Sequence, residues 1–204
     1  GRMAGAALWF LVMGAIVALY TLSGGVLWKL GINYDGVQGN PATKLHPSFY
    51  MLVIAFALYY VTRPDPFGAL RYVLDTNRGA VVLAFAAFLT LIHTVTSQLP
   101  GLTIPFDTYL LPVMMAILLL RQDEAFKARA EQVIHILMCA NALFGLFEFA
   151  IGHRFFPAVN DGVAFEFDTR SAGFLGHPLM NATITGTYVM ALMAGGSRLG
   201  FATK

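Results

Sequence analysis

The sequence contains little charge and almost no cysteine. Charged residues make up 12% of the 204 residues, about half of the share in a soluble globular domain, and Cys139 is the single cysteine. So few charges cannot cover the surface of a soluble protein of this size. One cysteine cannot form a disulfide-linked secreted scaffold. A disordered chain is excluded as well, because disorder requires low hydrophobicity and high charge.

Apolar side chains dominate the chain instead. They make up 57% of the residues, and the mean hydropathy is +0.67. This composition indicates an integral membrane protein, in which the positions of Lys and Arg are more informative than the net charge of +2. Neither a Walker pattern nor a Gly-x-Gly-x-x-Gly motif is present, and no Cys, His, Asp or Glu residues have metal-ligand spacing. We therefore expect no nucleic-acid partner, no metal and no other cofactor.

Six stretches of the sequence are candidates for membrane-spanning helices, since about 20 mostly apolar residues cross the bilayer core. They cover residues 3–30, 47–62, 79–97, 105–120, 132–151 and 178–196. The second and fourth are short, which tilt or local thinning of the bilayer accommodates. Gly24 and Gly25 are expected to end or bend the first, whose apolar run is too long for a cleaved signal peptide. The prediction is an all-α fold, a polytopic transmembrane helix bundle that forms one domain over residues 1–204.

The distribution of basic residues predicts the orientation of these helices. With the N-terminus in the cytoplasm, nine of the 13 Lys and Arg residues fall on the cytoplasmic side, as the positive-inside rule requires. The four on the other side are Lys29, Lys44, Arg154 and Arg170. The run from Arg63 to Pro66 is predicted to be a stiff cytoplasmic turn, and residues 152–177 an exported loop.

The exported loop and the helix that follows it contain features of an anion site. Arg170 is a permanent cation whose planar fork suits phosphate or carboxylate. Gly173 and Gly176 allow the backbone to bend and to approach a ligand closely. Pro178 fits the first turn of a helix, where free N–H groups favour an anion. Together these residues predict an anion site at the outer membrane surface.

Two interpretations of the charged residues remain open. The loop either binds an anion, or it packs against its neighbours with Arg170 paired to Asp168 or Glu166. Glu148 lies inside an apolar run, where an acid is costly and indicates a function. We expect it either to pair with Arg154 or Arg170, or to act as a base for an acceptor hydroxyl.

Other polar residues inside the spans have structural explanations. Asn141 and Cys139 are expected to pack or to bond between helices. His93 and His135 differ in depth by about 15 Å, from a rise of about 1.5 Å per residue, so they cannot share one haem. Each histidine either holds one pigment singly, or forms a hydrogen bond between helices or lies at the membrane interface.

One motif resembles a known family. The pattern Arg170-x-x-Gly173-x-x-Gly176-His177-Pro178-x-x-Asn181-Ala182, just before a membrane helix, is similar to the membrane O-antigen polymerase and ligase superfamily, in particular its exopolysaccharide polymerase-like members. Weaker similarity is found at Leu45–Ser48, Pro105–Pro112 and Phe147–Pro157. The resemblance covers most of the chain from about residue 45 onward, although only the Arg170–Asn181 motif is reasonably specific.

The resemblance implies an activity and a location. Members of the family are multi-pass proteins of the bacterial inner membrane, and this chain would resemble their N-terminal half. They are metal-independent glycosyltransferases that use glycans carried on undecaprenyl pyrophosphate at the periplasmic face. The implied partners are therefore the lipid bilayer and a polyprenyl-pyrophosphate glycan. The second half of the family's site, with further arginines, has no counterpart in this chain.

The resemblance also implies roles for individual residues. Arg170 would bind the lipid pyrophosphate and stabilise it as a leaving group, which requires a cation where negative charge develops. His177 would contact the same anion or the acceptor. Gly173, Gly176 and Asn181 would shape the binding site at the helix entrance. With Glu148 as the candidate base, the predicted catalytic residues are Arg170, His177 and Glu148.

Because the second half of the family's site has no counterpart here, alternatives to an active enzyme remain open. The chain is either part of a longer polymerase or ligase, or an inactive short relative. The competing class is a non-enzymatic accessory subunit of a larger bacterial membrane complex, including one that holds pigment or haem, with other membrane subunits as partners.

Overall fold

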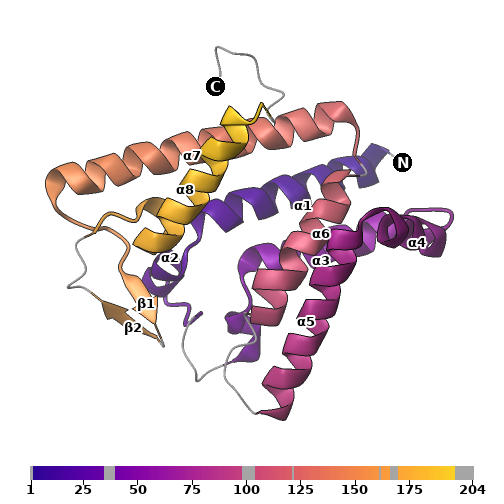
Figure 1. Cartoon of the computed structure of the whole chain (residues 1–204), viewed down its shortest axis with the longest axis horizontal. Helices are drawn as coiled ribbons and strands as arrows, with labels where there is room; N and C mark the ends of the chain where they lie inside the picture. Colours follow the sequence, from indigo (N-terminus) through magenta and orange to yellow (C-terminus); the bar gives the residue numbers. More distant parts are fainter. Residues whose placement is uncertain are drawn as a thin grey trace. The chain divides into compact units, whose positions relative to one another are not determined.

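Helices joined by short loops, with one small two-stranded sheet, make up the part of the chain that the structure describes (Figure 1). The structure is a computed structural model that describes residues 2–34, 40–97, 104–120, 122–160, 162–165 and 170–195. It divides into two units, each with its own internal contacts. Unit 1 consists of residues 1–15 and 40–126, and unit 2 of residues 16–39 and 127–204.

Unit 1 is a group of helices around an apolar core. Its elements are the first part of α1 (Arg2–Thr21), a 3₁₀ turn (Pro41–Lys44), α3 (Pro47–Val61), α4 (Pro66–Thr76), α5 (Arg78–Thr96), a π-helical segment (Ile104–Leu110) and α6 (Leu111–Leu120). Val113 and Ile117 of α6 form a buried cluster against Phe56 of α3 and Ala80 of α5. Helix α6 therefore packs against both α3 and α5, as Figure 1 shows.

Unit 2 is built on the long helix α7 and the segment that follows it. Its elements are the end of α1, α2 (Gly24–Lys29), most of α7 (Glu124–Ile151), β1 (Ala158–Asn160), β2 (Val163–Phe165), a 3₁₀ turn (Gly173–Leu175) and α8 (Pro178–Met193). The strands β1 and β2 pair antiparallel, with Val159 opposite Ala164. The sequence did not predict this hairpin, which lies inside the expected exported loop.

Local side-chain contacts explain where several helices begin. The carboxylate of Asp123 accepts a hydrogen bond from the N–H of Phe126 at 2.7 Å, which caps the start of α7. The carboxylate of Asp65 accepts a hydrogen bond from the N–H of Gly68 at 2.9 Å, and Pro66 occupies the first position of α4. Residues 66–76 are therefore helical, where the sequence analysis predicted only a turn around the two prolines.

The expectation of a mainly helical chain with helices of membrane type is confirmed. Ala4–Thr21, Arg78–Thr96 and Glu124–Ile151 are long and apolar enough to cross a membrane. The stretches Pro47–Val61 and Pro105–Leu120 are apolar but shorter, and α8 has 16 residues. A bundle of six spans therefore stays a prediction.

The first expected span, residues 3–30, is two helices in the structure. Helix α1 ends at Thr21 and α2 begins at Gly24, after the extended residue Ser23. A Cβ atom at Gly25 would lie 2.2 Å from the carbonyl oxygen of Pro157. The backbones of α2 and of the segment around Pro157 thus approach each other so closely that only glycine fits. This contact gives a physical reason for glycine at position 25, and the helix break that the glycine pair predicted lies directly before it, at Leu22 and Ser23.

Candidate functional site

The carboxylate of Glu148 is held by donors from both ends of the loop between α7 and α8, which the sequence analysis expected to be exported. The side chain is 1% exposed, near the end of α7. Its Oε2 accepts hydrogen bonds from the N–H of Ala172 at 3.0 Å, the N–H of Gly173 at 2.9 Å and the hydroxyl of Ser171 at 3.3 Å. Its Oε1 accepts a hydrogen bond from the N–H of Phe155 at 3.0 Å. These donors offset the cost of burying an acid, and they fasten the loop to α7.

Arg154 connects the beginning of the loop to the entrance of α8. The side chain is buried, and its Nε donates a hydrogen bond to the carbonyl oxygen of Phe156 at 2.7 Å. Its Nη2 donates a hydrogen bond to the carbonyl oxygen of Gly176. Arg154 therefore fixes the backbone at the point where the motif enters the helix.

Asn141 forms the third anchor, two helical turns before Glu148 on the same face of α7. Its side-chain oxygen accepts a hydrogen bond from the N–H of Phe174 at 2.8 Å. Its side-chain nitrogen donates a hydrogen bond to the side-chain oxygen of Asn181 on α8 at 2.7 Å. The prediction that Asn141 bonds between helices is confirmed, and its partner is one of the motif residues.

Aromatic rings pack around these anchors. The ring of Phe144 on α7 stacks on Phe174, with ring centroids 4.5 Å apart. The rings of Phe155 and Phe156 lie within 6 Å of Phe144, and the ammonium group of Lys29 lies 5.7 Å from the centre of the Phe156 ring. The loop is therefore held by apolar packing as well as by hydrogen bonds.

The two motif glycines are required by backbone conformation and by space. Gly173 has a φ of +57° and Gly176 a φ of +79°, a region that other residues rarely adopt. A Cβ atom at Gly173 would lie 2.5 Å from the side-chain oxygen of Asn141. A Cβ atom at Gly176 would lie 2.6 Å from the Cβ of Ser23. Both positions thus have structural reasons for glycine, whether or not a ligand approaches them.

His177 caps α8 with its side chain. The residue has an extended backbone, and Pro178 takes the first helical position. The Nδ1 of His177 accepts a hydrogen bond from the N–H of Leu179 at 3.2 Å. This contact assigns the proton of the neutral ring to Nε2, which then can donate a hydrogen bond to a ligand. One of the N–H groups that was expected to bind an anion is thus used by the cap.

Unit 1 contains a second His-Pro pair that makes the same kind of cap. The Nδ1 of His46 accepts a hydrogen bond from the N–H of Ser48 at 3.2 Å, and Pro47 begins α3. The N–H of His46 donates a hydrogen bond to the carboxylate of Asp107 at 2.9 Å. The side chain of His46 is buried, whereas that of His177 is exposed. A His-Pro cap can therefore be purely structural, and exposure distinguishes His177 as a candidate ligand.

Arg170 and His177 are the exposed residues of the segment 170–177. The residues between them are buried or half-buried, and the first four of them, residues 171–174, form hydrogen bonds with α7. Asp168 and Glu166, the acids proposed to pair with Arg170, lie outside the residues that the structure describes. The candidate site is therefore an exposed cation and an exposed imidazole at the two ends of an anchored segment.

The predicted site residues thus divide into two groups. Glu148, Gly173, Gly176 and Asn181 form the framework of the loop through their hydrogen bonds or their backbone conformations. The partners of Glu148 are backbone N–H groups and the hydroxyl of Ser171, which gives it a structural role, and its expected pairing with Arg154 or Arg170 stays a prediction. The sequence analysis did not assign Ser171 or Arg154 to the framework, because backbone carbonyl partners leave no trace in the residue pattern.

Histidines elsewhere in the spans have hydrogen-bonding partners. The Nδ1 of His135 on α7 is hydrogen-bonded to the hydroxyl of Tyr188 on α8, which confirms an interhelical bond. The Nδ1 of His93 lies 3.3 Å from the hydroxyl of Ser97 in the following turn. Within the described ranges, no group of three or more His, Cys, Asp or Glu side chains is arranged to hold a metal ion.

Comparison of the chain with protein-family models, with curated proteins and with solved structures finds no match.

Proposed function

We propose that the chain is a bacterial inner-membrane protein of the O-antigen polymerase and ligase type. In this proposal it binds a glycan carried on undecaprenyl pyrophosphate at the periplasmic face. The observation that carries the proposal is the exposed Arg170 at the end of a segment that α7 holds in place. The resemblance of the motif suggests that the anion is a lipid pyrophosphate. The exposure of Arg170 beside the anchored segment supports binding of the anion at this residue.

The framework makes Arg170 a suitable anion contact. The next residue, Ser171, donates a hydrogen bond from its hydroxyl to the carbonyl oxygen of Gly145 at 2.7 Å, and the N–H of Ala172 is bound by Glu148. The backbone adjoining Arg170 is thus fixed to a long helix, and less conformational entropy is lost when its side chain binds an anion. A guanidinium group can then donate two parallel hydrogen bonds to phosphate oxygens.

His177 is the proposed second contact. Its Nδ1 accepts a hydrogen bond from the helix backbone, so Nε2 carries the proton and can donate to a phosphate oxygen or to an acceptor hydroxyl. Because the cap also uses the N–H of Leu179, side chains are the proposed anion ligands in place of the helix N-terminus. Glu148 is a positioning residue in this proposal, since it acts through the loop that it anchors.

The proposed chemistry is stabilisation of a leaving group. In the transfer, the oxygen of an acceptor hydroxyl forms a bond to the anomeric carbon of the glycan, the bond from that carbon to the pyrophosphate oxygen breaks, and the hydroxyl proton passes to the departing pyrophosphate. Negative charge develops on the departing phosphate oxygen. A guanidinium group that hydrogen-bonds this oxygen lowers the barrier without a metal. This chain supplies the first cation of the site, and the resembling family uses further arginines for the complete reaction.

Substitution of Arg170 tests the proposal. Arg170→Ala, introduced into the native gene, is expected to abolish the glycan polymer or the ligated product while the protein still inserts into the membrane. Lys29→Ala is the matched control, because it removes another exposed positive charge that the sequence places on the same side. Unchanged glycan products in Arg170→Ala cells would refute the role, and stoichiometric co-purification with other membrane subunits would then indicate an accessory protein.

A further inference from the structure

Helix α4 has an apolar face that is exposed at Phe67 and Leu74 and half-buried at Leu70. Phe67, Leu70 and Leu74 follow one another at spacings of three and four residues, so they lie on one side of the helix. The side chain of Phe67 is 83% exposed, and so is that of Val61 at the end of α3. Large apolar side chains with this exposure indicate a surface that contacts something other than water.

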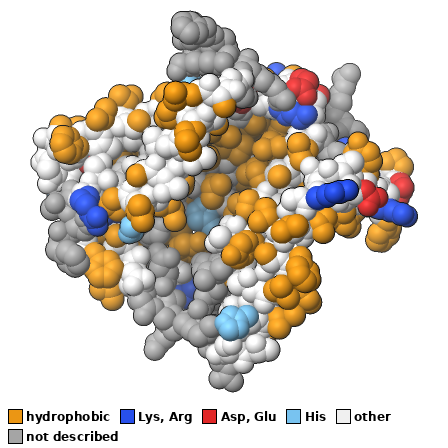
Figure 2. Space-filling view, in the orientation of Figure 1, with side chains coloured by type: hydrophobic (Ala, Val, Ile, Leu, Met, Phe, Trp, Pro, Cys, Tyr) orange, Lys and Arg blue, Asp and Glu red, His pale blue; other side chains and the backbone are white. Residues whose placement is uncertain are grey.

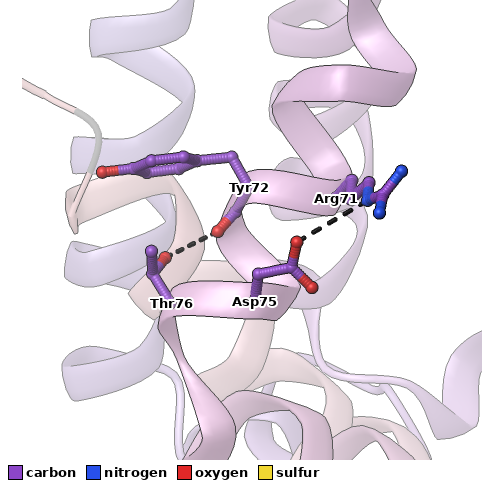
Figure 3. A network of polar contacts seen from close by, with 4 residues as sticks. All are labelled: Arg71, Tyr72, Asp75 and Thr76. Carbon is purple, nitrogen blue, oxygen red and sulfur yellow. Dashed lines mark hydrogen bonds and ion pairs between the residues drawn. The ribbon is translucent and has the colours of Figure 1, made fainter.

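The side of α4 opposite the apolar face carries hydroxyl groups. Tyr72 and Thr76 lie opposite the apolar face, and the hydroxyl of Thr76 donates a hydrogen bond to the carbonyl oxygen of Tyr72 at 2.7 Å (Figure 3). Arg71 lies between the two faces and forms an ion pair with Asp75, with Nε and Oδ2 3.7 Å apart. Both side chains of this pair are exposed, so the pair adds little stability and leaves Arg71 able to contact other anions.

The neighbours of α4 restrict where it lies. It follows the apolar helix α3 after a short turn, and α5 begins at Arg78, two residues after Thr76. Helix α5 is long and apolar enough to cross a membrane. The end of α4 is therefore tied to a helix that is long and apolar enough to cross a membrane, and its beginning to a shorter apolar helix, which keeps α4 close to the membrane surface. Figure 2 shows apolar, basic and acidic side chains together in this region, at the right of the view.

The charges near α4 match an anionic surface. Residues 63–78 contain Arg63, Arg71 and Arg78 against Asp65 and Asp75, which is three positive charges against two negative. The positive-inside distribution places this segment on the cytoplasmic side. The cytoplasmic leaflet carries anionic lipids that attract basic residues close to the surface.

We propose that α4 is an interfacial helix that binds anionic lipid of the cytoplasmic leaflet. Phe67, Leu70 and Leu74 insert among the upper parts of the acyl chains, while Arg71 and Arg78 bind lipid phosphates. Helices with one apolar face and basic residues at its edge bind membranes in this way. The proposal is independent of the exported loop and of the function proposed for it.

Spin-label accessibility in vesicles tests this placement. The full chain, with Cys139→Ser as background, carries a nitroxide at Phe67→Cys or, as the matched control, at Tyr72→Cys on the opposite side of α4. The vesicles contain phosphatidylcholine alone or with phosphatidylglycerol. Accessibility to oxygen reports immersion in the apolar layer, and accessibility to a water-soluble nickel chelate reports exposure to water.

We expect the label at residue 67 to be accessible to oxygen and shielded from nickel, and the label at residue 72 to show the reverse. Phosphatidylglycerol should increase the immersion at residue 67. Arg71→Gln and Arg78→Gln should each reduce the ratio of immersed to water-exposed label about fivefold, as expected for one basic side chain at an anionic surface. Arg129→Gln, at an exposed cytoplasmic position on α7, should not change it.

Three results would overturn the proposal. Equal access of nickel to residues 67 and 72 would place α4 in water. Shielding of residue 67 from both oxygen and nickel would indicate a protein partner or a second copy of the chain. Equal immersion of the label at residue 67 in vesicles with and without phosphatidylglycerol would show that α4 does not bind anionic lipid.

Discussion

Replacement of Glu148 by glutamine separates its structural role from a catalytic one. The amide side chain offers one oxygen where the carboxylate offers two. That oxygen can keep the hydrogen bonds from the N–H groups of Ala172 and Gly173. The amide nitrogen then faces the N–H of Phe155, and this N–H loses its hydrogen-bond acceptor. Two donors then face each other in a buried site.

The expected cost follows from these contacts. A buried donor without an acceptor costs about 1–3 kcal/mol, and the remaining hydrogen bonds lose the strengthening from the negative charge. We expect Glu148→Gln to destabilise the closed loop by about 2–4 kcal/mol. Amide hydrogen exchange at residues 155 and 171–173 should become roughly 30-fold to several hundred-fold faster, since each 1.4 kcal/mol is about a factor of ten.

Hydrogen exchange measured by mass spectrometry provides the assay. The full chain in lipid nanodiscs is compared with Glu148→Gln and with Glu124→Gln, an exposed acid at the start of α7 that serves as the control. Unchanged exchange at residues 171–173 in Glu148→Gln would show that the carboxylate does not hold the loop. A reduced yield of folded protein with normal activity per folded molecule would exclude Glu148 as a base.

Three further experiments test other parts of the framework. Gly173→Ala should destabilise the protein by about 1 kcal/mol or more beyond the effect of Gly152→Ala. Both glycines have positive φ, but only Gly173 lies against Asn141. Equal destabilisation by the two substitutions in thermal unfolding would contradict the steric argument. A double-mutant cycle of Asn141→Ala and Asn181→Ala should give a coupling of about 0.6–1.7 kcal/mol, the range for hydrogen bonds between membrane helices, and a coupling of zero would contradict the contact. His177→Ala should destabilise the protein by about 1 kcal/mol, because the cap of α8 is lost. His177→Asn should retain the stability, since asparagine also caps helices. Both variants of His177 should bind the anion more weakly. Normal anion binding by His177→Asn would show that His177 only caps the helix.

The helices and the breaks between them could largely be predicted from the sequence. Long apolar runs dictated α5 and the apolar part of α7, and the pair Gly24-Gly25 indicated the break after α1. Helix α4 was missed because Pro64 and Pro66, before and at its first residue, suggested a turn, and because its apolar pattern covers only three turns. The hairpin of β1 and β2 was missed because each strand has only three residues.

The candidate site was predictable in part. The motif pointed to residues 170–181 as a special segment, and the buried acid Glu148 stood out in an apolar run. Their connection could not be predicted, because the N–H groups that bind Glu148 lie 24 and 25 residues further along the chain. Backbone N–H groups are present at nearly every residue, so the sequence pattern does not show which of them a carboxylate will select.

The central claim is that Arg170, held by the anchored loop, binds a lipid pyrophosphate. The most direct measurement is the affinity of the full chain in nanodiscs for undecaprenyl pyrophosphate, determined by native mass spectrometry. We predict that Arg170→Ala weakens this affinity roughly tenfold to a hundredfold, as expected for loss of hydrogen bonds to a charged group, while Lys29→Ala leaves it unchanged. Equal affinity of the unsubstituted chain and Arg170→Ala would contradict the claim.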